Sequence, residues 1–223
     1  MAATPEAFEL KARLKQAGDA LPETLRVRIH RALSWLARAE KESRDHDARF
    51  IFLWIAFNAA YAQEFGPEQA ERAQLRAFLT KLVAVDGGKA LHRLLFEKYT
   101  GPVRLLIENK FVFEPFWRAL RTHDASNEWG MRFQHEKKAA LKAVMSNETV
   151  TVLGVVFDRL YVLRNQLVHG GATWNGQVNR PQVRDGAELL HSIVPAIVAL
   201  MLEHPELDLG SISFPVIGAV PRA

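Results

Sequence analysis

The chain has 223 residues, of which 48% are hydrophobic and 24% are charged, the composition of a globular protein with a sizeable core rather than of a disordered segment. It contains no cysteine, which excludes disulfides, thiolate nucleophiles and cysteine-type zinc sites. The net charge of +4 permits a polyanionic partner but is far weaker than that of a dedicated basic arm.

No targeting or membrane segment is evident in the sequence. The N-terminal residues 1–16 lack the uninterrupted apolar run of a secretory signal. The longest charge-free apolar stretch, residues 189–202, is interrupted by Pro195 and is shorter than the roughly 20 residues that a bilayer requires. We therefore expect a cytoplasmic protein without a membrane span.

The first helices of the core are predicted within residues 21–65. Residues 1–20 are polar and are expected to form a frayed helix or a mobile lead-in. From Pro22 to about Ser43, apolar residues recur at helical spacing: Leu25, Ile29, Leu33 and Leu36. The opposite side of this helix is basic, and it is either a solvated face or a surface that meets phosphates; it carries Arg26, Arg28, Arg31 and Arg38.

A second helix should follow Asp45 and Asp47, which can cap its N-terminus, and should end at Gly66-Pro67. This helix is apolar nearly all round, which predicts a place at the centre of a bundle or in a subunit interface. Asn58 is a polar exception in it. Its amide either forms a structural hydrogen bond between helices or contacts a ligand.

The middle region, residues 66–145, is predicted to be a helical insertion. One or two helices are expected over residues 68–97, with a break at Gly87-Gly88, and residues 102–122 are apolar and aromatic. A loop should follow over 122–130, and a lysine- and alanine-rich helix over 134–144. The purpose of this region does not follow from its sequence.

Residues 146–205 should hold a long helix, capped by Ser146 or Asn147, and a final helix over 182–203. The segment VTVLGVVF would also suit a strand, but a three-four spacing continues to Leu167, and Gly170-Gly171 then provides a helix stop. No alternating pattern occurs elsewhere, so we predict an all-α protein. The C-terminal tail, residues 206–223, contains the apolar segment SISFPVIGAV, and three alternatives stay open for it: packing on the bundle, pairing with an edge or contact with a neighbour.

The candidate site lies at the end of the long helix. At 100° per residue, Asn165 and His169 share one stripe with Asp158 and Val162, whereas Arg164 starts about 140° from His169. Histidine can accept or give a proton near neutral pH, and arginine presents a fork that matches two phosphate oxygens. Both properties suit cleavage of RNA, which supplies its own 2′-hydroxyl nucleophile. No HxxxH or HExxH motif occurs, so we predict no metal site and no cofactor.

The segment RNQLVH, from Arg164 to His169, resembles the motif of HEPN domains, in which an arginine and a polar residue precede a histidine. LWIAFNAAY resembles the second helix of larger members. The resemblance implies a HEPN-like helical bundle with an additional helical insertion, and a homodimer that brings two motifs into one cleft. It also implies metal-independent cleavage of RNA, with an RNA or nucleotide ligand and, in some systems, an antitoxin partner in toxin–antitoxin or phage-defence pairs.

Carried over to this chain, the resemblance gives Arg164 the role of binding phosphate, His169 that of proton transfer, and Asn165 that of positioning either. Tyr161, Trp174 and Asn58 are candidates for contacts with a base, although packing in a core or interface would also explain the two aromatic residues. Two alternatives stay open for the motif: a helix end whose basic residues favour the dipole, and a non-catalytic module that binds nucleotide, RNA or a partner protein.

Overall fold

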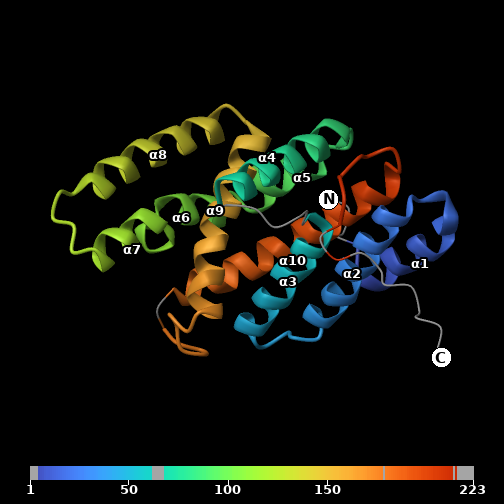
Figure 1. Cartoon of the computed structure of the whole chain (residues 1–223), viewed down its shortest axis with the longest axis horizontal. Coiled ribbons are helices and arrows are strands. Elements are labelled where there is room, and N and C mark those ends of the chain that lie inside the picture. Colours follow the sequence, from blue (N-terminus) through green and yellow to red (C-terminus); the bar gives the residue numbers. More distant parts are fainter. Residues whose placement is uncertain (1–4, 62–67, 178, 213, 215–223) are drawn as a thin grey trace, which may run out of the picture.

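The computed structural model describes residues 5–61, 68–177, 179–212 and 214, and within them every regular element is helical (Figure 1). The predicted all-α class is therefore confirmed. In chain order the helices are α1 (Ala7–Ala17), α2 (Glu23–Ala39), α3 (His46–Tyr61), α4 (Glu68–Val85), α5 (Ala90–Arg93), α6 (Thr100–Glu108), α7 (Glu114–Arg121), α8 (Glu128–Met145), α9 (Thr149–Val168) and α10 (Arg180–Glu203). The 3-10 turns Gly18–Ala20 and Lys110–Val112 and a π-helical turn, Leu94–Lys98, lie between them.

Helices α2, α3 and α10 pack together and form the centre of the molecule. The apolar stripe predicted on α2 is buried, since its isoleucine and three leucines are at most 3% exposed. Helix α2 ends at Ala39 instead of near Ser43. Residues 41–44 are all polar, so a longer helix would bury no further apolar surface.

The apolar surface all round helix α3 is explained by packing against other helices of the same chain. It packs against α2, α9 and α10, and its least covered side carries Phe52, whose ring stacks on Trp35 at 5.8 Å between centroids. The guanidinium of Arg38 lies 4.6 Å from the same ring. The predicted helix end at Gly66-Pro67 lies outside the described residues.

Helix α10 approaches its neighbours closely at Gly186. A Cβ at this position would lie 2.9 Å from Leu160 Cδ2 on α9 and 3.0 Å from Phe50 Cε2 on α3. Length and composition alone would allow α10 to cross a membrane, but 72% of its most apolar 18-residue stretch is buried inside the protein. Its apolar surface is therefore largely covered by the protein itself.

Of the two expectations for residues 1–20, a frayed helix or a mobile lead-in, the helical one agrees with α1, which packs on the bundle, whereas residues 1–4 lie outside the described residues. Helix α1 contacts α2 and α10, and it buries Ala7 and Leu10 completely, at 1% and 0% exposure. The backbone N–H of Ala7 donates a 2.8 Å hydrogen bond to the Glu40 carboxylate at the end of α2. Burial is the largest influence on Glu40 and raises the pKa of its carboxyl group.

The middle region contributes to the main core. Helix α4 packs on α9, and α6 packs on both α9 and α10, with Phe78, Leu82 and Ile107 buried in the common cluster. The Gly87-Gly88 break separates α4 from α5 as predicted. Helices α7 and α8 extend to one end of the molecule (Figure 1) and enclose a small aromatic cluster of their own, formed by Phe113, Phe116 and Phe133. Helix α8 begins at Glu128, six residues before the predicted start at 134.

Arg28 corrects the expectation of a basic, accessible face on α2. It is only 1% exposed, and its Nη2 donates hydrogen bonds to the backbone carbonyls of Leu209, Gly210 and Ser211 at 3.2, 3.3 and 2.7 Å. Arg31 donates to the carbonyl of Phe214 at 2.7 Å. The carbonyls of these four tail residues therefore bind side chains of α2, whereas most of the SISFPVIGAV segment lies outside the described residues.

Candidate functional site

Helix α9 carries the RNQLVH motif at its C-terminal end. Its predicted stripe is buried as far as Leu163, with Leu153, Leu160 and Leu163 at most 1% exposed, and Leu167 is half-buried. The ambiguous VTVLGVVF segment is helical because it belongs to the bundle core. Neither predicted cap supplies a side-chain hydrogen bond: the N-cap is Glu148, which also makes none, and Asn147 adopts a left-handed turn with φ 54°.

Helix α9 ends just before Gly170-Gly171, as predicted. His169 is the C-cap, with φ −95° and ψ 15°, and Gly170 follows with φ 69°, a backbone conformation that residues with a Cβ rarely adopt. The motif histidine therefore stands at the junction between a rigid helix and a loop.

Arg164 and Asn165 are brought into direct contact. Arg164 Nη1 donates a 2.8 Å hydrogen bond to Asn165 Oδ1. The same guanidinium lies 5.6 Å from the centroid of the Tyr161 ring, close enough for a cation–π interaction. Arg164 thus contacts the amide of Asn165 and the ring of Tyr161. Arg164 and Asn165 are both half-buried.

His169 presents an exposed imidazole. Its backbone N–H donates to the carbonyl of Asn165 at 3.0 Å, which closes the last helical turn. The ring forms no hydrogen bond or ion pair with another residue in the described part of the chain. This position suits proton exchange with a bound ligand, and it also suits the simpler alternative of a histidine that favours the helix dipole.

Tyr161 and Asn58 line one narrow aromatic pocket. Its volume is about 30 Å³, and Trp54, Phe57 and Phe157 form other parts of its wall. The Trp54 indole N–H is buried without a hydrogen-bond partner among the described residues. The pocket brings together two of the three residues predicted to contact a base, but at this volume it holds a water rather than a base.

Trp174 lies apart from that pocket, in the loop between α9 and α10. It is 74% exposed, and its Nε1 donates a 2.9 Å hydrogen bond to Asp45 at the start of α3. Asp45 also accepts the predicted cap hydrogen bond from the backbone of Ala48, at 3.0 Å. Hydrogen bonding, chiefly from Ala48, lowers the pKa of the Asp45 carboxyl group.

Asp47 has a role that the sequence did not reveal. It is 7% exposed and forms a two-pronged ion pair with Arg180 at the start of α10, at 2.7 and 3.1 Å. It also accepts a 3.1 Å hydrogen bond from the backbone of Asn175. Asp47 therefore holds the middle of the loop that follows the motif histidine and the start of α10. The only sequence signal was its apparent role as a helix cap.

Gln166, inside the motif, connects three elements. Its Nε2 donates to the carbonyl of Phe111 at 2.8 Å, and its Oε1 accepts from Asn179 at 2.9 Å. It links α9 to the turn before α7 and to the start of α10. Its role is to hold the motif in place.

Asp158 lies on the His169 stripe nearer to the start of α9, and it forms an ion pair of 3.6 Å with Arg72 of α4. Burial is the largest influence on its carboxyl group and raises its pKa. Among the described residues, no three His, Cys, Asp or Glu side chains gather as a metal site would require.

Comparison with models of known protein families, with curated proteins and with solved structures found no match. The resemblance to HEPN domains therefore rests on the RNQLVH motif, on LWIAFNAAY and on the position of the motif at the end of α9.

Proposed function

We propose that this protein is a metal-independent endoribonuclease that uses Arg164, Asn165 and His169. The observation that carries the proposal is the combination of a guanidinium held by Asn165 with an exposed imidazole one helical turn further along the same face. Phosphodiester cleavage needs both a fixed positive charge and a group that exchanges protons near neutral pH.

In the proposed reaction the neutral His169 ring accepts the proton of a ribose 2′-hydroxyl. The 2′-oxygen then attacks the adjacent phosphorus, and the bond from phosphorus to the 5′-oxygen breaks. The departing oxygen takes a proton from a second acid or from water. The products are a 2′,3′-cyclic phosphate and a 5′-hydroxyl. Arg164 binds the non-bridging oxygens as charge builds on them.

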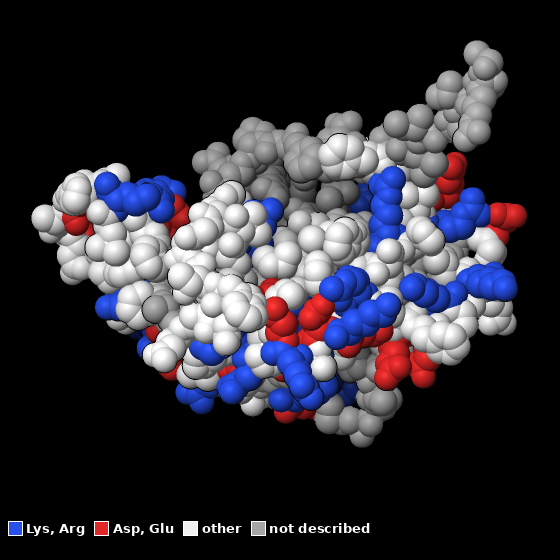
Figure 2. Space-filling view, turned by 90° about the horizontal axis from the view of Figure 1, so that it is seen from below, with Lys and Arg blue, Asp and Glu red and all other residues white. Residues whose placement is uncertain are grey.

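The surface charge is compatible with an RNA ligand but does not select one. On the face shown in Figure 2, lysine and arginine side chains are interspersed with acidic ones instead of forming a single basic surface. This agrees with the modest net charge of +4. Binding would therefore depend on local arginine clusters more than on a long-range field.

The test is to incubate the purified protein with RNA in EDTA and to examine the cleaved ends. We expect cyclic phosphate ends from the wild type and none from His169→Ala. Cleavage that stops in EDTA, or that survives intact in a folded His169→Ala protein, would contradict the proposal.

The second candidate is a non-catalytic module that binds nucleotide, RNA or a partner protein. It is favoured by the engagement of Arg164 with Asn165 and Tyr161, which leaves part of the guanidinium fork already occupied. This candidate would be supported if wild type and His169→Ala bound RNA with equal affinity and neither cleaved it.

We also propose a homodimer in which the two motifs face each other. The starting angle of about 140° between Arg164 and His169 on a regular helix makes it difficult for one chain to aim both at a single phosphate. In a two-fold contact the arginine of one chain can approach the histidine of the other. The apolar surface of α3 no longer supports this dimer, because packing within one chain covers most of it.

A further inference from the structure

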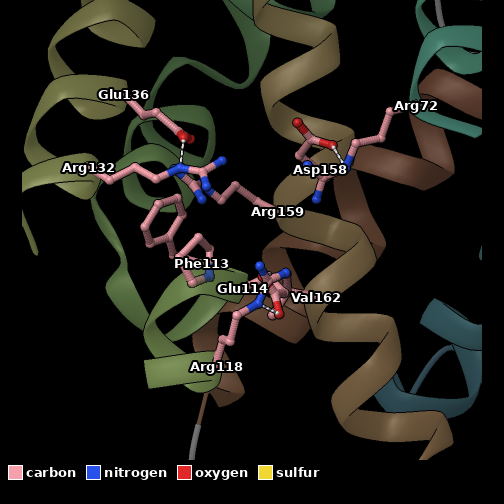
Figure 3. Close-up of a pocket in the computed structure, with 10 residues that line it drawn as sticks. Arg72, Phe113, Glu114, Arg118, Arg132, Glu136, Asp158, Arg159 and Val162 are labelled. Atoms are coloured by element: carbon pink, nitrogen blue, oxygen red, sulfur yellow. Dashed lines mark hydrogen bonds and ion pairs between the residues drawn. The ribbon is translucent and has the colours of Figure 1, made fainter. Parts of the chain in front are cut away.

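A second cavity, of about 220 Å³, lies between α9, α7 and α8, with Arg72 of α4 at its edge (Figure 3). We define this arginine pocket by its charged lining residues, which are Arg72, Arg118, Arg132, Arg159, Glu114, Glu136 and Asp158. Phe113, Pro115 and Val162 complete its wall. Its volume has room for a group much larger than a single water.

Each of the three carboxylates in the pocket already has an arginine partner. Glu114 binds Arg118 at 2.9 Å, and Glu136 binds Arg132 at 2.7 Å. Asp158 pairs with Arg72, as described above. These pairs use every acidic group of the pocket and three of its four arginines (Figure 3).

Arg159 is the fourth arginine and the most deeply buried of the four. It is 5% exposed, and its Nε has no hydrogen-bond partner among the described residues. Its guanidinium forms no ion pair or hydrogen bond with any residue that the structure describes. Instead, it lies 4.6 Å from the ring centroid of Phe113 and 5.9 Å from that of Phe133.

A buried cation without a counter-ion is unfavourable, because removal from water is compensated only in part by aromatic rings. Burial lowers the pKa of Arg159, while the nearby Glu136 and Asp158 carboxylates act in the opposite direction. Figure 3 shows the side chain extending from α9 toward the side of the pocket formed by Arg132 and Glu136. An anion in the pocket would supply the missing partner.

We propose that the arginine pocket binds a phosphate group through Arg159. The guanidinium fork matches two phosphate oxygens, and arginines from three other helices surround the same space. The phosphate belongs either to an internal phosphodiester of an RNA strand or to a free nucleotide.

The pocket opens on the same side of α9 as the motif. Asp158 and Val162 line it, and they lie on the stripe that continues to Asn165 and His169. Arg159 and His169 are ten positions apart, about 15 Å along a helix axis, a distance that a few nucleotides span. If an RNA strand is the ligand, its placement across both sites rests on the proposed ribonuclease function. The pocket would then bind a phosphate upstream or downstream of the phosphate that is cleaved.

The experiment measures binding separately from cleavage. The probes are adenosine monophosphate and a fully 2′-O-methylated RNA strand of about 12 nucleotides, which lacks the hydroxyl needed for cleavage. Wild type is compared with Arg159→Met, which removes the charge and keeps an unbranched side chain between the two aromatic rings. The matched control is Arg104→Met, which removes an exposed arginine of α6 outside the pocket.

We expect Arg159→Met to fold with unchanged or higher thermal stability, because a buried charge is replaced by an apolar group. Its affinity for the phosphate-bearing probe should fall at least tenfold, and Arg104→Met should bind as wild type does. For the RNA probe, the slope of log affinity against log salt should decrease by about 0.7, the value for one lost phosphate contact on a single strand. Should Arg159→Met prove unfolded, Arg132→Gln, at the exposed side of the pocket, should show a weaker loss in the same direction.

If Arg159→Met loses affinity for the monophosphate, the pocket binds the phosphate of a free nucleotide. If the loss is confined to the RNA probe, the pocket binds a phosphate of the strand. Equal binding by wild type and Arg159→Met, or no binding of either probe by wild type, would overturn the proposal. RNA cleavage by wild type, together with binding of both probes that does not depend on Arg159, would refute the pocket and leave the ribonuclease intact. Arg159-dependent binding without any cleavage would refute the ribonuclease and leave the pocket.

Discussion

Arg164 donates a 2.8 Å hydrogen bond from Nη1 to the side-chain oxygen of its neighbour Asn165. Consecutive residues leave a helix about 100° apart, so this bond draws the guanidinium toward the face that Asn165 shares with His169. The long stem of Arg164 thereby closes part of the angular gap within a single chain. In the proposed dimer, the partner chain would have to close only the remainder.

Replacing Arg164 by lysine should lower the rate of RNA cleavage about 10- to 100-fold, because a point charge cannot keep both the Asn165 bond and a phosphate contact, and a hydrogen bond to a charged group contributes about 1.5–3 kcal/mol. Single-turnover cleavage assays would measure the change. Arg104→Lys is the matched control and should cleave RNA at the wild-type rate. Wild-type rates in Arg164→Lys would argue against phosphate binding by this residue.

His169→Ala should reduce cleavage by about 100-fold or more, the typical contribution of a general acid or base. Because the ring is exposed and bonds to no described residue, the free energy of unfolding should change by less than about 0.5 kcal/mol. Cleavage assays and urea denaturation on the same preparation separate the two effects. A large loss of stability would show that the histidine has a structural role.

A heterodimer of one Arg164→Ala subunit and one His169→Ala subunit tests the shared site. Each variant should be inactive as a homodimer. If the site is shared, the mixed dimer retains one arginine and one histidine in the common cleft and should recover part of the wild-type rate. A stable mixed dimer without activity would indicate that each chain holds its own complete site or that both histidines are required.

Asp47→Asn should destabilise the protein by about 1.5–3 kcal/mol, the contribution of a hydrogen bond to a charged group, because Arg180 would lose its only described carboxylate partner in a poorly solvated position. Cleavage should fall as well, since the loop after His169 loses an anchor. Asp19→Asn is a suitable control. Its ion pair with Arg26 involves a carboxylate that is 99% exposed, and such surface pairs contribute about 0–1 kcal/mol. Similar stability losses in both variants would contradict this account.

Gly186→Ala should cost about 1–3 kcal/mol of stability, the usual effect of added volume in a packed core. The added methyl group would meet Leu160 and Phe50 at 2.9 and 3.0 Å, and these two side chains, or the helices that carry them, would have to shift. Gly88→Ala, where a Cβ meets nothing within 4 Å, is the comparison in thermal or chemical unfolding. A stable Gly186→Ala protein would mean that α10 shifts without cost.

The sequence alone determined the helical class, the buried stripes of α2 and α9, the break at Gly87-Gly88 and the end of α9 beside His169. These features depend on local spacing, on the conformational freedom of glycine and on which face of a helix is apolar, all of which can be deduced from neighbouring residues. For the same reason the positions of Asn165 and His169 on one face could be predicted without a structure.

Only the tertiary structure decided what covers each face and which charges lack a partner. Arg28 has the sequence context of a solvated basic face, yet it is buried because carbonyls from Leu209 to Ser211, more than 180 positions away, accept its hydrogen bonds. Asp47 has the context of a helix cap and instead binds Arg180, 133 positions away. Arg159 has no ion-pair partner in the described parts of the chain, because each pocket carboxylate, from three different helices, pairs with another arginine. Helical periodicity gives the direction of a side chain, but its partner depends on contacts between segments far apart in the chain, which periodicity does not encode.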